Sequence, residues 1–162
     1  MKTIITLLLA GALTACGSQS SQSQPLSAAS TKLENEDLSD SLTGIDANGD
    51  GVRDDIEAHL KKRLADKPDV LYWALEFAKS QAATVLATNR QQAIESGLQV
   101  TQTMGCLVAT FAKDDGWILL SRDITAFSFN TEPRLQAYRA SWKLRSGGSF
   151  SGDKSLCKAN VK

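Results

Sequence analysis

Apolar residues recur at helical spacing from residue 52 onward. Ile56, Leu60 and Leu64 are four residues apart, which marks one face of a helix over about residues 54–64. Proline at position 68 cannot continue that helix but suits the first turn of the next. A second apolar stripe follows it at helical spacing, through Val70, Leu71, Ala74, Phe77, Ala78, Ala82, Val85 and Leu86.

Three further helices are expected toward the C-terminus. Thr88 and Gln91 have the spacing of a capping box, so a helix is predicted from near Asn89 to about residue 112. Residues 117–129 suit either a strand pair or a short helix, and their helical neighbours and the lack of a hairpin turn favour the helix. Thr131-Glu132-Pro133 predicts the start of a last helix, which a loop-like tail follows. The pattern therefore predicts an all-α domain of four or five helices, entered through a loop, over residues 44–162.

The segment before this domain has little to bury. Residues 17–31 are rich in Ser and Gln, and residues 32–43 are acidic and weakly apolar. Such a composition cannot offset the entropy lost on ordering, so residues 16–43 are expected to form a flexible tether.

The first sixteen residues carry a targeting pattern. Lys2 precedes an apolar run from Ile4 to Leu13, which is about half the roughly 20 residues that a membrane span needs. The next residues, Leu13-Thr14-Ala15-Cys16, resemble the lipobox of bacterial lipoproteins. That resemblance implies that residues 1–15 are a signal peptide and that Cys16 is lipidated and acylated at its new amino terminus. Gly17, where an aspartate would resemble the inner-membrane retention signal, favours anchoring in the outer membrane of the cell envelope.

Residues 46–57 have oxygen-bearing side chains at the spacing that wraps a chain around one calcium ion. Gly51 allows the sharp turn within this stretch. Glu57, in the first turn of the following helix, would close the site with two oxygens. The expected ligands are Asp46, Asn48, Asp50, the backbone carbonyl of Val52, Asp54 and Glu57.

This stretch resembles an EF-hand loop, with two departures. Arg53 stands where the family has an aliphatic residue that pairs with a second loop, and neither an entering helix nor a second loop is evident. The pattern is therefore closer to the single calcium loops of dockerins and thrombospondin repeats. It also resembles small bacterial envelope lipoproteins that place such a loop before a helical domain. Because sensing relies on paired loops, the resemblance implies a structural ion.

Two thiols remain once Cys16 is lipidated. An envelope is oxidising, so Cys106 and Cys157 are expected to form a disulfide between the third helix and the tail. The only histidine, His59, is expected on the surface, away from the apolar face of its helix.

The charge balance and the lack of a catalytic set limit the functions to consider. The chain has 18 basic and 18 acidic residues, and removal of residues 1–15 takes away one basic residue, Lys2. The net charge of the remaining chain is therefore about −1 (17 − 18), and no basic field would attract nucleic acid. The sequence favours a non-enzymatic calcium-binding lipoprotein that engages an envelope protein or glycan. Two alternatives stay open: an inhibitor or immunity-type lipoprotein, and a small hydrolase using Asp114, Asp115, Asp123 or Glu132.

Overall fold

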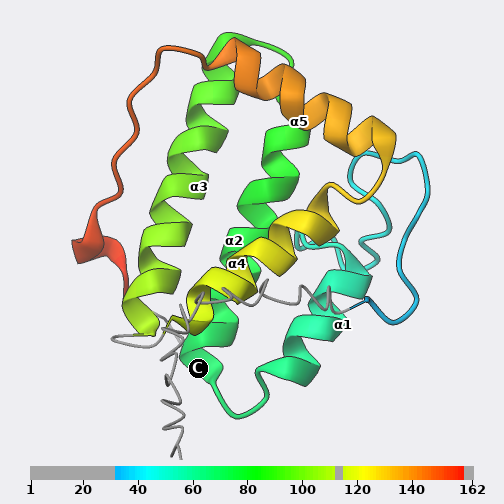
Figure 1. The fold of residues 1–162 in the computed structure, drawn as a ribbon, viewed down its shortest axis with the longest axis vertical. Helices are drawn as coiled ribbons and strands as arrows, with labels where there is room; N and C mark the ends of the chain where they lie inside the picture. The colour runs from blue at the N-terminus through cyan, green and yellow to red at the C-terminus, as the bar shows by residue number, and fades with distance from the viewer. Residues whose placement is uncertain (1–31, 112–114, 159–162) are drawn as a thin grey trace, which may run out of the picture.

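The computed structural model describes residues 32–111 and 115–158, and this part of the chain is all-α (Figure 1). Its five α-helices are α1 (Asp54–Arg63), α2 (Pro68–Val85), α3 (Arg90–Thr110), α4 (Gly116–Ser128) and α5 (Glu132–Leu144), followed by the 3-10 turn η1 (Lys154–Leu156). The fold class and the number of helices predicted from the sequence are confirmed. None of these helices is both long and apolar enough to cross a membrane.

The helices pack around α2. Helices α2 and α3 form an antiparallel pair, α4 crosses α2, and α5 lies across α2 and α3 where they are joined (Figure 1). Apolar stripes meet at the centre, where Leu60, Phe77, Leu107 and Ile124 have no solvent exposure. Burying such side chains is the main favourable term in folding.

Residues 117–129, for which a strand pair was the alternative, are helical. Residues 117–128 lie in α4 and Phe129 is its C-cap; the helix buries Leu120, Ile124 and Phe127 on one face. These three positions follow the spacing of three and four that a helix requires.

The start of α3 differs by one residue from the expected capping box. Asn89 is the N-cap, and its side chain accepts a hydrogen bond from the backbone N–H of Gln92 at 3.0 Å. The Gln92 side chain reaches back to the backbone N–H of Thr88 at 2.9 Å. Asn and Thr both cap helices well, so the adjacent pair left two registers possible and the asparagine took the cap.

The tether was expected to extend to residue 43, and its last part, from residue 33 onward, belongs instead to the folded domain. Leu33 is only 3% exposed and belongs to the hydrophobic core. Residues 36–45 are hydrogen-bonded to α1 and to the α4–α5 connection, as described below. The burial of one leucine and a set of buried ion pairs stabilise this segment in the folded domain, although its acidic composition offers few apolar residues. The expected signal peptide (residues 1–15), the lipidated Cys16 and the tether over residues 17–31 lie outside the described residues.

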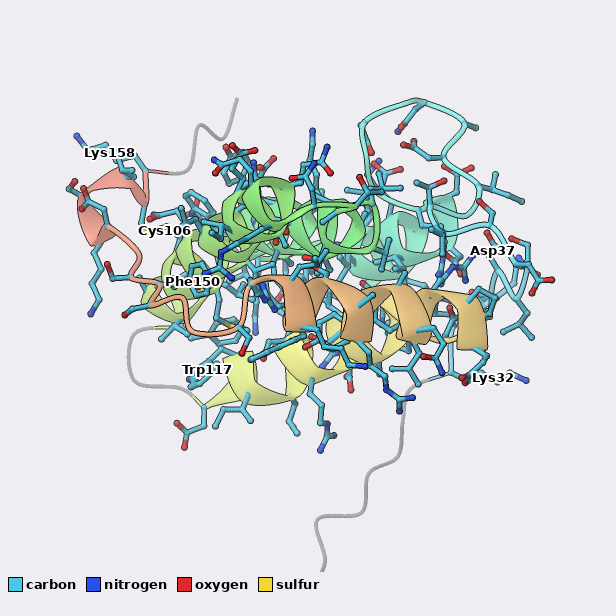
Figure 2. All side chains as sticks on the ribbon, turned by 90° about the horizontal axis from the view of Figure 1, so that it is seen from above. Lys32, Asp37, Cys106, Trp117, Phe150 and Lys158 are labelled. Atoms are coloured by element: carbon cyan, nitrogen blue, oxygen red, sulfur yellow. A yellow bond between two sulfur atoms is a disulfide. The ribbon has the colours of Figure 1, made fainter. Side chains whose placement is uncertain are left out.

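The C-terminal tail returns to α3. Cys106 and Cys157 form a disulfide, the pairing expected from the sequence. η1 therefore lies beside the C-terminal part of α3, as Figure 2 shows near the labelled Cys106. The linkage closes a loop with a sequence separation of 51 residues.

Candidate metal centre

The loop before α1 is curled by its own acidic side chains. Asp46 accepts hydrogen bonds from the backbone N–H groups of Gly49 and Gly51, each at 2.8 Å. Asn48 Oδ1 accepts from the N–H of Asp50 at 3.0 Å. Asp50 Oδ1 in turn accepts from the N–H of Val52 at 2.8 Å. Three of the expected ligand side chains therefore turn toward the inside of one loop.

Two glycines permit this path. Gly49 has φ 71° and Gly51 has φ 89°, in the left-handed region where a Cβ atom is unfavourable. A Cβ on Gly51 would also lie 3.2 Å from Cε of Lys79 on α2. The backbone angle at residue 51 therefore favours glycine, and a larger residue there would also have to displace the Lys79 side chain.

The remaining expected ligands lie at the start of α1. Asp54 Oδ1 accepts from the N–H of Ala47 at 3.1 Å, which ties the two ends of the loop together. Glu57 Oε2 is 3.4 Å from Asn48 Nδ2, and its Oε1 is 2.6 Å from Lys61 Nζ. The carbonyl oxygen of Val52 accepts no hydrogen bond among the described residues.

No three His, Cys, Asp or Glu side chains are grouped as a ready metal site within residues 32–111 and 115–158. The expected set would instead combine carboxylates with the Asn48 amide oxygen and the Val52 carbonyl. Its key bidentate member, Glu57, is held by Lys61 and Asn48. To bind an ion, Glu57 would exchange these two partners for the cation.

Four carboxylates share this loop, at positions 46, 50, 54 and 57. A hydrogen bond from the backbone N–H of Val52 is the largest cause that lowers the pKa of Asp50, and Lys79 contributes in the same direction. A carboxyl group with a lowered pKa stays ionised at neutral pH. The loop therefore concentrates negative charge and hard oxygen donors, the chemistry that calcium prefers.

A buried polar network adjoins the loop through Arg53, and no local pattern in the sequence indicates it. Arg53, 5% exposed, donates from Nη2 to Asp55 Oδ2 at 2.9 Å and from Nη1 to Asn130 Oδ1 at 3.0 Å. Asp55 also accepts from the backbone N–H of Asp37 at 2.8 Å. Arg53 is the residue that departs from the EF-hand pattern, and here it joins the loop to the α4–α5 connection.

Arg134 of α5 completes the network from the other side. Its side chain has no solvent exposure and donates to the backbone carbonyls of Asp37 at 2.7 Å and Ser41 at 2.9 Å. It also donates to Asn130 Oδ1 at 2.7 Å and pairs with Asp37 Oδ2 at 3.4 Å. We call Asp37, Arg53, Asp55, Asn130 and Arg134 the arginine–aspartate network.

The charges in this network are matched. Burial alone would raise the pKa of Asp37, but hydrogen bonds from Ser39 and Ile45 and the charge of Arg134 hold that pKa well below its usual range. Burial, followed by the nearby charge of Arg53, lowers the pKa of Arg134. Two cations and two anions with shared hydrogen bonds form a closed set, which is how buried charge is tolerated.

His59 is half-buried, so its expected place on the open surface is wrong. Its ring packs edge-on against Phe127 with centroids 5.3 Å apart, because this side of α1 faces α4. Burial and then the charge of Arg63 lower the pKa of His59, against the effect of Asp123. Its buried Nε2 atom has no hydrogen-bond partner among the described residues. The ring borders a cavity of about 580 Å³ between α1 and residues 32–34.

The acidic residues considered for a hydrolase do not converge on one cleft among the described residues. Asp123 pairs with Arg63 at 2.9 Å, and Glu132 accepts from Gln136 on its own helix. Asp115 is exposed beside the start of α4, and Asp114 lies outside the described residues.

Comparison with known proteins finds no matching family model, no similar curated protein and no similar solved structure.

Proposed function

We propose that this chain is a calcium-binding lipoprotein of the cell envelope, anchored through Cys16 and serving a structural or partner-binding role. The ion would be held by Asp46, Asn48, Asp50, the Val52 carbonyl, Asp54 and Glu57. It would fix the point where the lipid-anchored segment meets the helical domain. The calcium part and the lipid anchor are separate parts of the proposal.

The observation that carries the calcium proposal is the hydrogen-bond pattern inside the loop. The side chains at its first, third and fifth positions each accept from a backbone N–H farther along, so the chain already follows a curled path. Asn48 Nδ2 lies 3.0 Å from Asp50 Oδ2 and 3.4 Å from Glu57 Oε2, which brings the two ends of the ligand set together. A cation here would take the place of the Asn48 amide hydrogens, with the Asn48 side chain turned so that its oxygen faces the ion.

The proposed ion would act as a staple. Without a paired second loop, affinity is expected in the weak extracellular range, with Kd about 10⁻⁴–10⁻³ M. At about 1 mM calcium and Kd about 0.1 mM, binding adds about 1.4 kcal/mol to the free energy of unfolding. That amount is a modest addition to the roughly 5–15 kcal/mol by which a typical domain is stable, as expected of a structural ion.

The first test compares melting temperatures of the full chain in detergent, in EDTA and in calcium at about 1 mM. Calcium should raise the melting temperature of the wild type by about 5 °C. Glu57→Gln should show no such rise, because it loses the bidentate ligand. Glu95→Gln on α3 makes the same chemical change at an exposed glutamate and should respond as the wild type does. An equal rise in wild type and Glu57→Gln would place the ion elsewhere.

A partner-binding role is supported by an aromatic cluster that runs from the end of α4 along α5. The rings of Phe129 and Tyr138 are stacked with centroids 4.2 Å apart, and Tyr138 contacts Trp142 edge-on at 6.5 Å. Trp142 is 54% exposed. Exposed, pre-ordered aromatic rings are typical of recognition surfaces. The same cluster would also suit an inhibitor or immunity-type lipoprotein.

A further inference from the structure

Arg145, at the C-terminal end of α5, is a buried cation without an anionic partner in the part of the chain that the structure describes. The residue is only 7% exposed. Its guanidinium carbon lies 4.6 Å from the centre of the Trp142 ring and 5.9 Å from that of Phe150. Among the described residues, no carboxylate pairs with it and no acceptor takes a hydrogen bond from its side chain.

The end of helix α5 does not supply the missing acceptor. Carbonyl groups at a helix C-terminus favour a nearby cation. Here, however, Arg90 of α3 takes the carbonyl oxygens of Leu144 at 2.8 Å and Ser146 at 3.2 Å. Arg145 is therefore a second guanidinium at a helix end that already has one, and burial lowers the pKa of its side chain.

Burying a charge without an anion is unfavourable, and the two aromatic rings beside this guanidinium offset only part of that cost. Gly97 of α3 leaves room for the guanidinium, since a Cβ at that position would lie 2.8 Å from Arg145 Nη1. The guanidinium also keeps a solvent-facing edge, because none of its nitrogens is both fully buried and unpartnered. A ligand can therefore approach it from solvent, past residues 146–149, which are exposed.

We propose that Arg145 and Trp142 form a binding site for an anionic sugar, with the anion on the guanidinium and the sugar ring against the indole. The guanidinium offers paired N–H donors that match a carboxylate or a phosphate. Trp142 is more than half exposed and lies beside the guanidinium, so a ring-shaped ligand held by Arg145 can contact the indole from solvent. This inference rests on the proposed binding role and does not involve the calcium loop.

The test uses the ¹⁵N-labelled full chain in detergent and follows the Arg145 Nε–H and Trp142 indole N–H signals. Glucuronate and glucose 6-phosphate are titrated as a carboxylate-bearing and a phosphate-bearing sugar. Glucose and inorganic phosphate are the one-part controls. At least one anionic sugar should shift both signals saturably, and each control should bind about tenfold more weakly or less. The anion that binds better identifies the source of the negative charge.

Variants separate the two halves of the site. Arg145→Met should abolish the binding, and Trp142→Ala should weaken it while leaving the charge in place. Lys143→Met, which removes an exposed cation two residues away, should bind as the wild type does. Glu57→Gln should also bind normally, so that failure of the calcium proposal stays distinguishable. Equal binding to Arg145→Met, no saturable shift, or equal affinity for inorganic phosphate and both sugars would overturn the assignment.

Discussion

Two sets of carboxylates in adjacent parts of the chain have opposite electrostatic surroundings. Asp37 and Asp55, in the arginine–aspartate network, are buried and face Arg53 and Arg134. Of the loop carboxylates, Asp46, Asp50 and Asp54 accept hydrogen bonds from the loop's own backbone. Among the described residues only Glu57 of this set forms an ion pair, with Lys61 at 2.6 Å. Asp55 lies in the same twelve-residue stretch, residues 46–57, as the four loop carboxylates.

The difference lies in where the positive charge comes from. In the network the protein supplies it from α5 and from the loop itself, so the set is closed and structural. In the loop the protein gathers oxygen donors and supplies little positive charge of its own. A site of that kind gains most from a cation taken from solution.

The largest expected effect comes from opening the closed set. Arg134→Met should lower the free energy of unfolding by about 3–5 kcal/mol, because it leaves Asp37 buried without its cation. Chemical denaturation at neutral pH measures this change. Arg139→Met, at an exposed position of the same helix, should cost less than about 0.5 kcal/mol. Similar losses in the two variants would show that the network contributes no more than a surface charge.

Acid should weaken the network through Asp37. The folded-state pKa of Asp37 is lowered, so its ionised form stabilises the folded protein. This contribution to the free energy of unfolding is present above the unfolded pKa of about 3.9 and is lost as the pH falls through that value toward the folded pKa. Between pH 6 and pH 3 the wild type should lose about 1 kcal/mol more stability than Asp37→Asn. Denaturation curves at the two pH values test this, and parallel losses would contradict it.

Arg145 should show the smallest effect, and with the opposite sign. Because its charge is buried without an anion, Arg145→Met should leave the free energy of unfolding unchanged or raise it by about 0.5 kcal/mol. The same denaturation experiment measures it beside Arg134→Met. A loss of more than about 2 kcal/mol would instead make Arg145 a structural residue like Arg134.

The helices were predictable from the sequence because their apolar stripes are regular and their starts carry proline or capping residues. Pro68 and Pro133 each mark a first helical turn, and α4 follows from its helical neighbours. The cap of α3 was missed by one residue because Thr88 and Asn89 are both good caps. Local patterns of this kind are visible within a few residues.

The arginine–aspartate network was not predictable in the same way. Asp37 and Arg134 are separated by 97 positions in the sequence, and neither lies in a motif. The one local signal was Arg53, a charged residue where an EF-hand loop has an aliphatic one. A position that departs from a motif indicates a different partner, but it does not identify that partner. For the same reason residues 33–43 were assigned to the tether.

The central claim is that the loop over residues 46–57 takes its positive charge from calcium, and direct titration tests it. Isothermal titration of calcium into the full chain in detergent should give one ion per chain with Kd about 10⁻⁴–10⁻³ M. Glu57→Gln should give no saturable heat, and Arg145→Met should give the wild-type curve. The absence of saturable binding by the wild type, or an unchanged curve for Glu57→Gln, would contradict the account.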